Sequence, residues 1–156
     1  MEVQHQQISK SVIGSNVISS VVLTIYYQEK DLPYKVYRIN IQELIERDMA
    51  KKFKEQLQKL KLTYRERGIR FIRAEINTTD FYFIYPLYGY KSLDDIIENL
   101  EVFRTIDILE PNNTRNEFIT VVKDKLNSNR LEFWYYRDRK TGFLRLYHIK
   151  MYPRDF

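Results

Sequence analysis

The sequence predicts an α+β fold: a single domain in which a mainly antiparallel sheet packs against one long helix and two shorter helices. Three observations support this prediction. The chain has 156 residues, 44% of them hydrophobic and 30% charged, a size and composition that suit one globular core. Short runs rich in β-branched and aromatic residues are bounded by turn residues, which indicates strands. Three further segments begin with a polar capping residue followed by an acidic residue three positions later, which indicates helices.

The predicted elements follow the order ββαββααββ along the chain. They are strands over residues 17–27 and 34–39, a helix over 41–65, strands over 69–77 and 81–90, helices over 92–103 and 114–126, and strands over 131–137 and 143–152. The capping boxes are Asn40 with Glu43, Ser92 with Asp95, and Thr114 with Glu117. Gly68 ends the long helix. Residues 1–12 are polar and are expected to be flexible, which leaves 13–156 as the single domain.

Several reaction classes are excluded by the residue types that the chain lacks. It has no cysteine, which excludes disulfides, thiolate catalysis and cysteine-ligated metals. Its two histidines, His5 and His148, are too few for a multi-histidine metal site. The sequence shows no glycine-rich phosphate loop, signal peptide or apolar membrane span. We therefore expect an intracellular protein that has no membrane partner.

Residue usage is skewed toward Ile, Lys, Asn, Tyr and Phe, with only four glycines and two alanines. An abundance of Lys, Arg and Glu is typical of proteins from hot habitats. In this composition the chain resembles the small orphan proteins of DNA viruses that infect crenarchaea. The resemblance implies a thermophilic protein of a virus or mobile element that works in the host cytoplasm.

The predicted helix over 41–65 separates apolar and basic side chains onto opposite faces. Phe53 and Leu57 lie mid-helix on the apolar face and are expected to be core. The opposite face carries a row of side chains three or four residues apart, namely Arg47, Lys51, Lys54, Gln58, Lys61 and Arg65, of which five are cations. The basic run continues with Arg67, Arg70 and Arg73. Residues 51–73 hold nine Lys and Arg against two Glu, a net of +7, whereas the whole chain carries +5.

A long, straight row of cations matches a run of phosphates, so the leading hypothesis is a nucleic-acid-binding protein, with DNA favoured over RNA. Two alternatives stay open. The row is simply the solvated face of a thermostable helix, or it docks an acidic partner, which would make the chain a protein-binding regulatory or structural module. A homodimer is compatible with each of these hypotheses.

The stretch FYFIYPLYGY over residues 81–90 contains six aromatic residues. Its first half is apolar on both faces of a strand, which predicts a buried position. Beyond Pro86, Tyr88 and Tyr90 flank Gly89 and are predicted to expose rings on which bases can stack.

Any catalysis would rest on carboxylates that bind Mg²⁺ or Mn²⁺, as in many nucleases. Glu75 in the strand over 69–77 is the predicted catalytic residue and metal ligand, and Asp80 at the following turn is the second ligand. Glu132 is a further candidate. The triplet Asp138-Arg139-Lys140 matches an acidic-x-Lys element of metal-dependent nucleases, but a chain this rich in charge contains such triplets by chance.

The closing hairpin is both basic and aromatic, and residues 140–142 are its predicted loop. The register then places Arg139 opposite Phe143, Trp134 opposite His148 and Glu132 opposite Lys150. Cross-strand pairs of this kind are usually structural, although a basic, aromatic hairpin also suits a nucleic-acid groove.

Overall fold

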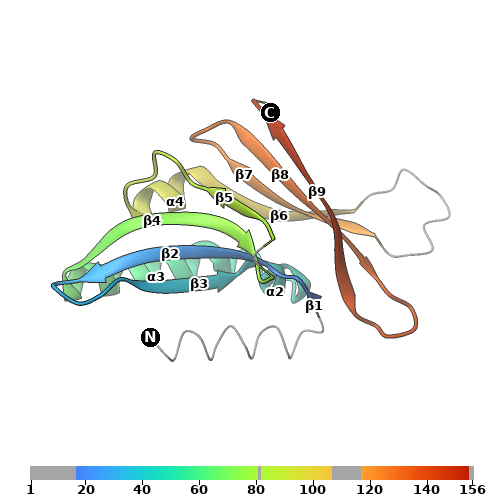
Figure 1. Cartoon of the computed structure of the whole chain (residues 1–156), viewed down its shortest axis with the longest axis horizontal. Coiled ribbons are helices and arrows are strands. Elements are labelled where there is room, and N and C mark those ends of the chain that lie inside the picture. The colour runs from blue at the N-terminus through green and yellow to red at the C-terminus, as the bar shows by residue number, and fades with distance from the viewer. Residues whose placement is uncertain (1–16, 81, 107–116, 155–156) are drawn as a thin grey trace.

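Two β-sheets dominate the computed structural model, which describes residues 17–80, 82–106 and 117–154 (Figure 1). The strands of the first sheet are β2 (Val21–Glu29), β3 (Lys35–Asn40), β4 (Ile69–Thr78) and β5 (Ile84–Pro86). They lie in the order β3-β2-β4-β5, and all pairs are antiparallel.

The second sheet contains β1 (Val17–Ile18), β6 (Leu100–Ile106), β7 (Phe118–Asp124), β8 (Asn129–Arg137) and β9 (Leu144–Pro153). Its order is β1-β9-β8-β7-β6, with β1 parallel to β9 and the other pairs antiparallel. The α+β class predicted from the sequence is therefore confirmed.

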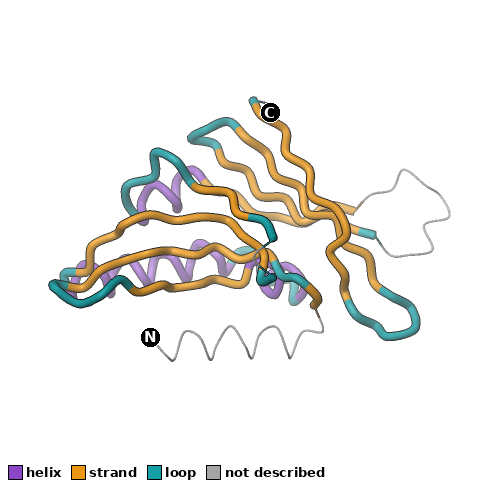
Figure 2. The backbone as a smooth tube through the Cα atoms, in the orientation of Figure 1, coloured by secondary structure: helices purple, strands orange, loops and turns teal. Residues whose placement is uncertain are grey.

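The described helices are α2 (Ile41–Glu46), α3 (Lys52–Arg67) and α4 (Leu93–Asn99). Both α2 and α3 lie along one face of the first sheet, and α4 leads directly into β6 (Figure 2). No helix of the described residues is long and apolar enough to cross a membrane.

One hydrophobic core connects the two sheets. The apolar side of α3, with Phe53 at 1% and Leu57 at 0% exposure, belongs to the same buried cluster as Phe133 of β8. Phe83 meets Phe133 edge to face, with ring centroids 5.6 Å apart, which ties the segment before β5 to the second sheet. The predicted core face of the long helix is confirmed.

The predicted helix over 41–65 is in fact two helices. Met49 N donates to Leu44 O at 2.7 Å and Asp48 N to Ile45 O at 3.0 Å, the bond pattern of a Schellman cap. This cap requires a left-handed residue, and Asp48 takes that position with φ 56°. Aspartate is one of the few side chains that tolerate it, which is why the chain turns here without a glycine. Gly68 ends α3 as predicted, with φ 65°.

The predicted helix over 114–126 is wrong, because residues 118–124 form strand β7. The sequence FITVVKD is β-branched and pairs along its length with both β6 and β8. Tertiary pairing here outweighs the local signal of the capping box, most of which lies outside the described residues. The predicted helix over 92–103 is shorter than expected, since α4 ends at Asn99 and β6 begins at Leu100.

The aromatic stretch is a short strand rather than a ten-residue one. Only Ile84–Pro86 pairs with β4, and Tyr82 is 92% exposed. Phe83 and Tyr85 are partly buried against the core, whereas Ile84 is 53% exposed, so the predicted burial of the first half is wrong for the face that carries Tyr82 and Ile84. Phe81 and the N-terminal segment over 1–12 lie outside the described residues.

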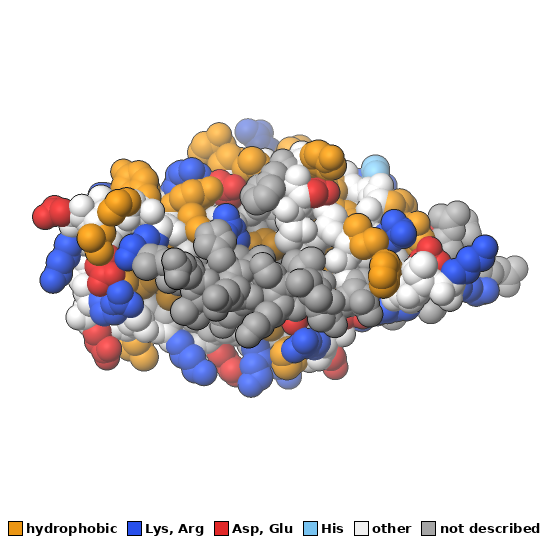
Figure 3. All heavy atoms as spheres, turned by 60° about the horizontal axis from the view of Figure 1, so that its bottom comes forward, with side chains coloured by type: hydrophobic (Ala, Val, Ile, Leu, Met, Phe, Trp, Pro, Cys, Tyr) orange, Lys and Arg blue, Asp and Glu red, His pale blue; other side chains and the backbone are white. Residues whose placement is uncertain are grey.

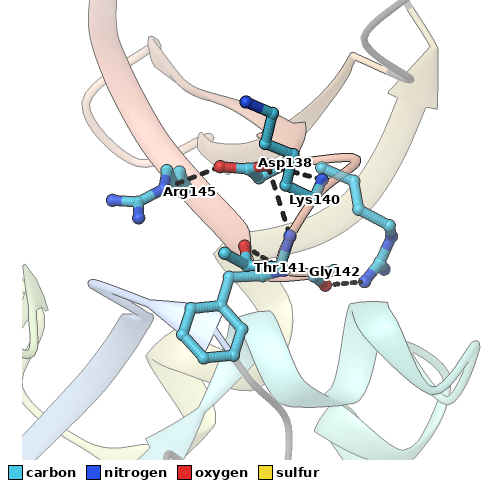
Figure 4. Close-up of polar contacts among 7 residues, drawn as sticks. Asp138, Lys140, Thr141, Gly142 and Arg145 are labelled. Carbon is cyan, nitrogen blue, oxygen red and sulfur yellow. Dashed lines mark hydrogen bonds and ion pairs between the residues drawn. The ribbon is translucent and has the colours of Figure 1, made fainter.

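The closing hairpin forms as predicted, with Trp134 opposite His148 and Glu132 opposite Lys150. A register shift at Trp134/Tyr135 displaces the tip by one residue. Asp138 rather than Arg139 therefore lies across from Phe143, since Asp138 N donates to Phe143 O at 2.9 Å. The Asp138 carboxylate accepts bonds from the amides of Lys140 and Thr141 (Figure 4). The acidic-x-Lys triplet is a turn motif.

Candidate nucleic-acid interface

Folding places part of the predicted cation row of α3 beside the acidic segment that follows it. Lys61 Nζ lies 2.6 Å from Asp94 Oδ1 at the start of α4. In the view of Figure 3, Lys and Arg are interspersed with Asp and Glu over the coloured part of the surface. The charge that is segregated along the sequence is therefore partly neutralised in space.

Most of the other predicted cations also have carboxylate or amide partners. Arg47 pairs with Glu43 at 2.9 Å, and Arg67 binds both oxygens of Glu29, at 2.6 and 3.2 Å. Arg73 is 2.8 Å from Glu75 and stacks over the Tyr26 ring at 3.7 Å, while Arg70 donates to Gln28 at 2.6 Å. Lys51, Lys54 and Arg65 are exposed and make no ion pair within the described residues. The predicted row is thus reduced to three uncompensated cations.

Two of these three cations border a groove. A cavity of about 470 Å³ lies between the start of α3 and β6, and Lys51, Lys54 and Phe103 line it. The rest of the lining is apolar except for Glu101: it includes Phe53 of the core and Val102. The groove thus combines apolar side chains with two lysines and one carboxylate.

Phe103, which lines the groove, also belongs to one face of the second sheet. Phe103 of β6 lies opposite Val121 of β7, Val121 opposite Glu132 of β8, and Glu132 opposite Lys150 of β9, so these side chains share that face. Lys123 Nζ is 5.7 Å and Arg130 Cζ 5.9 Å from the centroid of the Phe103 ring.

Trp134 extends the same array. Lys150 Nζ lies 5.0 Å from the Trp134 ring centroid, and His148 meets that ring edge to face. We call the combined surface the basic–aromatic face, and its members are Lys51, Lys54, Phe103, Lys123, Arg130, Trp134 and Lys150.

Two carboxylates lie at this face: Glu132 holds two of its members, and Glu101 lines the groove. Glu132 is 7% exposed and accepts bonds from Arg130 Nε at 2.9 Å and Trp134 Nε1 at 3.2 Å. Glu101 pairs with Lys125, whose hydrogen bond is the largest influence that lowers the pKa of Glu101. Lys51, Lys54 and Lys150 of the face make no ion pair within the described residues, so they contribute positive charge to it.

The predicted stacking tyrosines have different fates. Tyr88 is 72% exposed, as expected. Tyr90 is only 5% exposed, and its hydroxyl donates to Asp124 at 2.6 Å, which contradicts the prediction of a free ring. Burial, together with the Asp124 bond, raises the pKa of Tyr90 well above its usual range.

The predicted metal ligands bind different partners. Glu75 is 7% exposed and holds Arg73, whereas Asp80 accepts bonds from Ser19 at 2.8 Å and Thr78 at 2.6 Å. Burial acts to raise the pKa of Asp80, but these hydrogen bonds outweigh it and lower the pKa. Nowhere in 17–80, 82–106 and 117–154 do three Asp, Glu or His side chains gather as metal ligands would. Glu75 and Asp80 therefore form no shared metal site within the described residues. Metal-dependent cleavage stays a prediction.

The sequence did not identify Phe103, Lys123 and Arg130 as residues that share one surface. Both Phe103 and Lys123 fall in segments predicted as helices, where their cross-strand relation is invisible. The β-branched and aromatic residues of LEVFRTI over 100–106 were the signal for a strand.

No protein-family model, curated protein or solved structure matches this chain.

Proposed function

We propose that the protein binds nucleic acid along the basic–aromatic face, with DNA as the ligand to test first. The observation that carries the proposal is the surrounding of Phe103: Lys51 and Lys54 share its groove, and Lys123 and Arg130 approach its ring. Cations beside an aromatic ring are the combination that single-stranded nucleic acid requires, because phosphates need positive charge and bases stack on rings.

Single-stranded nucleic acid suits this face better than a rigid duplex. Phe103 and Trp134 belong to neighbouring rows of one sheet, and only an unstacked base can cover a ring that lies against a sheet. A duplex can make the same phosphate contacts, but its paired bases cannot stack on these two rings. We therefore expect tighter binding of single-stranded DNA than of duplex DNA at equal salt.

The test is a fluorescence-anisotropy titration of labelled single-stranded and duplex oligonucleotides. Lys51→Glu with Lys54→Glu reverses two charges on the groove, and it should weaken binding at least about tenfold. Lys52→Glu with Lys59→Glu is the matched control, because it makes the same charge change on the opposite flank of α3. Equal losses in both double variants would show that only net charge matters and would overturn the assigned face.

A second candidate function rests on exposed hydrophobic side chains around β5. Tyr82, Ile84, Tyr88 and Leu126 are 92%, 53%, 72% and 45% exposed. The strand is short and has β4 on one side only, so a partner strand can extend the sheet. This arrangement supports the alternative of a protein-binding module. Loss of nucleic-acid binding in all conditions would favour it.

A further inference from the structure

Strand pairing determines how far apart the two rings of the basic–aromatic face lie. Strands β6, β7 and β8 are neighbours in the second sheet (Figure 1), and Phe103 of β6 is level with Glu132 of β8 through Val121 of β7. Trp134 follows Glu132 by two residues on the same face of β8. Two strand spacings across the sheet and two residues along it place the Cα atoms of Phe103 and Trp134 about 12 Å apart.

The surface between the two rings offers no further ring on which a base can stack. Val121 is 0% exposed and Glu132 is 7% exposed, and neither side chain is aromatic. Phe103 and Trp134 are each half-buried, so both remain partly accessible. A strand that crosses this part of the face can therefore stack one base on each ring, but not a base that lies between them.

Glu132 helps to maintain the separation of the two rings. Its carboxylate accepts hydrogen bonds from Trp134 Nε1 at 3.2 Å and from Arg130 Nε at 2.9 Å. The Arg130 guanidinium in turn borders Phe103, with Cζ 5.9 Å from the ring centroid. One buried carboxylate thus positions the Trp134 indole and the cation beside Phe103 before any ligand is bound, which lowers the entropy lost on binding.

Each ring also has its own cations. Lys51 and Lys54 line the groove that contains Phe103, and Lys150 Nζ lies 5.0 Å from the centroid of the Trp134 ring. Phosphates on both sides of a stacked base can therefore meet positive charge at either ring.

The separation of the rings selects the conformation of the strand. Neighbouring bases of a stacked strand lie about 3.4 Å apart, less than a third of the distance between the rings. Two adjacent stacked bases therefore cannot cover both Phe103 and Trp134. An extended strand with unstacked bases can reach both rings when one nucleotide lies between the two bases that stack.

We propose that the basic–aromatic face recognises an extended single strand through two non-adjacent bases, one on Phe103 and one on Trp134, and leaves the base between them unbound. This inference rests on the proposed function and adds to it the spacing of the bases that are recognised.

The test uses abasic DNA strands of equal length that carry two thymines, either adjacent or separated by one or several abasic residues. All strands have the same charge, so differences in Kd measured by fluorescence anisotropy report the spacing of the bases. The strand with one intervening abasic residue should bind at least about fivefold more tightly than the strand with adjacent thymines, because it stacks a second base.

Trp134→Ala should abolish this preference, so that the two strands bind equally, whereas Trp134→Phe keeps a ring and should retain it. Tyr34→Ala is the matched control, since Tyr34 is 63% exposed and precedes β3 in the first sheet, and it should change neither Kd. Melting curves of the Trp134 variants by circular dichroism verify that they are folded.

The outcomes distinguish the two proposals. If strands with two thymines bind more tightly than a fully abasic strand but their spacing has no effect, or adjacent thymines bind best, the inferred spacing is overturned while the proposed function stands. If no strand binds, including one with thymine at every position, both proposals are overturned.

Discussion

Asp124 shows how one buried residue organises its surroundings. It is fully buried, and its carboxylate accepts bonds from the hydroxyls of Tyr85 and Tyr90, both at 2.6 Å, and from Asn127 Nδ2 at 2.8 Å. No cation is paired with it within the described residues. The carboxylate is therefore stabilised by these hydrogen bonds, and each bond to a charged buried group is worth more than an ordinary one.

Tyr90→Phe should lower the free energy of unfolding by about 1–3 kcal/mol, because it leaves Asp124 short of one donor. Tyr88→Phe is the matched control, since Tyr88 is exposed, and it should change stability by less than about 0.5 kcal/mol. Urea unfolding of both variants measures the difference. Equal stabilities would mean that the Asp124 network does not stabilise the fold.

Tyr90 also shows a limit of sequence reasoning at this scale. Its partner Asp124 lies 34 residues away in the chain, and no local pattern distinguishes a tyrosine that meets it from one that faces solvent. Trp134 and His148, in contrast, are joined by a short turn, so their pairing followed from the hairpin register alone.

Helix α3 was predictable as an amphipathic element because its apolar spacing is regular. Leu57→Ala should lower the free energy of unfolding by about 2–5 kcal/mol, since the side chain is fully buried. Leu62→Ala on the same helix should cost under about 1 kcal/mol, because Leu62 is 55% exposed. Chemical denaturation of the two variants measures both changes in the free energy of unfolding. A Leu57→Ala cost below that of Leu62→Ala would place the core on the other face.

The cap between α2 and α3 makes a prediction at the element scale. Asp48 has φ 56°, a conformation that costs a side chain with a Cβ roughly 1–2 kcal/mol. Asp48→Gly should therefore maintain or raise the melting temperature, whereas Asp48→Ala should lower it. If Asp48→Ala instead gives the higher melting temperature of the two variants, the Asp48 side chain rather than its backbone conformation maintains the break between α2 and α3.

Elements with strong local signals were predictable, and those decided by distant pairing were not. The closing hairpin needs only its own turn, and Gly68 ends α3 by its own conformation. Strand β7 instead depends on two neighbouring strands that the sequence does not identify. The basic–aromatic face was hidden for the same reason, because its members come from α3 and four strands.

At the scale of the whole molecule, buried tyrosines predict the response to alkaline pH. Burial raises the pKa of Tyr37, Tyr64, Tyr85, Tyr90 and Tyr135 above the ordinary value of 10.0. A pKa that is higher in the folded state gives stability that is complete below pH 10 and is lost as the pH rises through the folded pKa.

The protein should therefore unfold cooperatively above about pH 10, with a rise in tyrosinate absorbance that coincides with loss of circular dichroism. Exposed tyrosines such as Tyr88 should titrate before that transition. Ionisation of all the tyrosines in one step near pH 10 without unfolding would contradict the burial of these five rings.

Charge is also a property of the whole molecule rather than of a segment. The net of +7 over residues 51–73 suggested a continuous cationic row, but folding pairs four of the eight predicted cations with carboxylates, namely Arg47, Lys61, Arg67 and Arg73. The cations that matter for the proposed function are therefore those arranged around Phe103, and they come from distant parts of the chain.

The most direct test of the proposed function is the salt dependence of binding to single-stranded DNA. If the five cations of the basic–aromatic face contact phosphates, log K should fall against log salt with a slope of about −3 to −4. Lys51→Glu with Lys54→Glu should make that slope shallower by about 1.5, whereas Lys52→Glu with Lys59→Glu should leave it unchanged. A slope near zero, or one that the groove variants do not alter, would contradict the account.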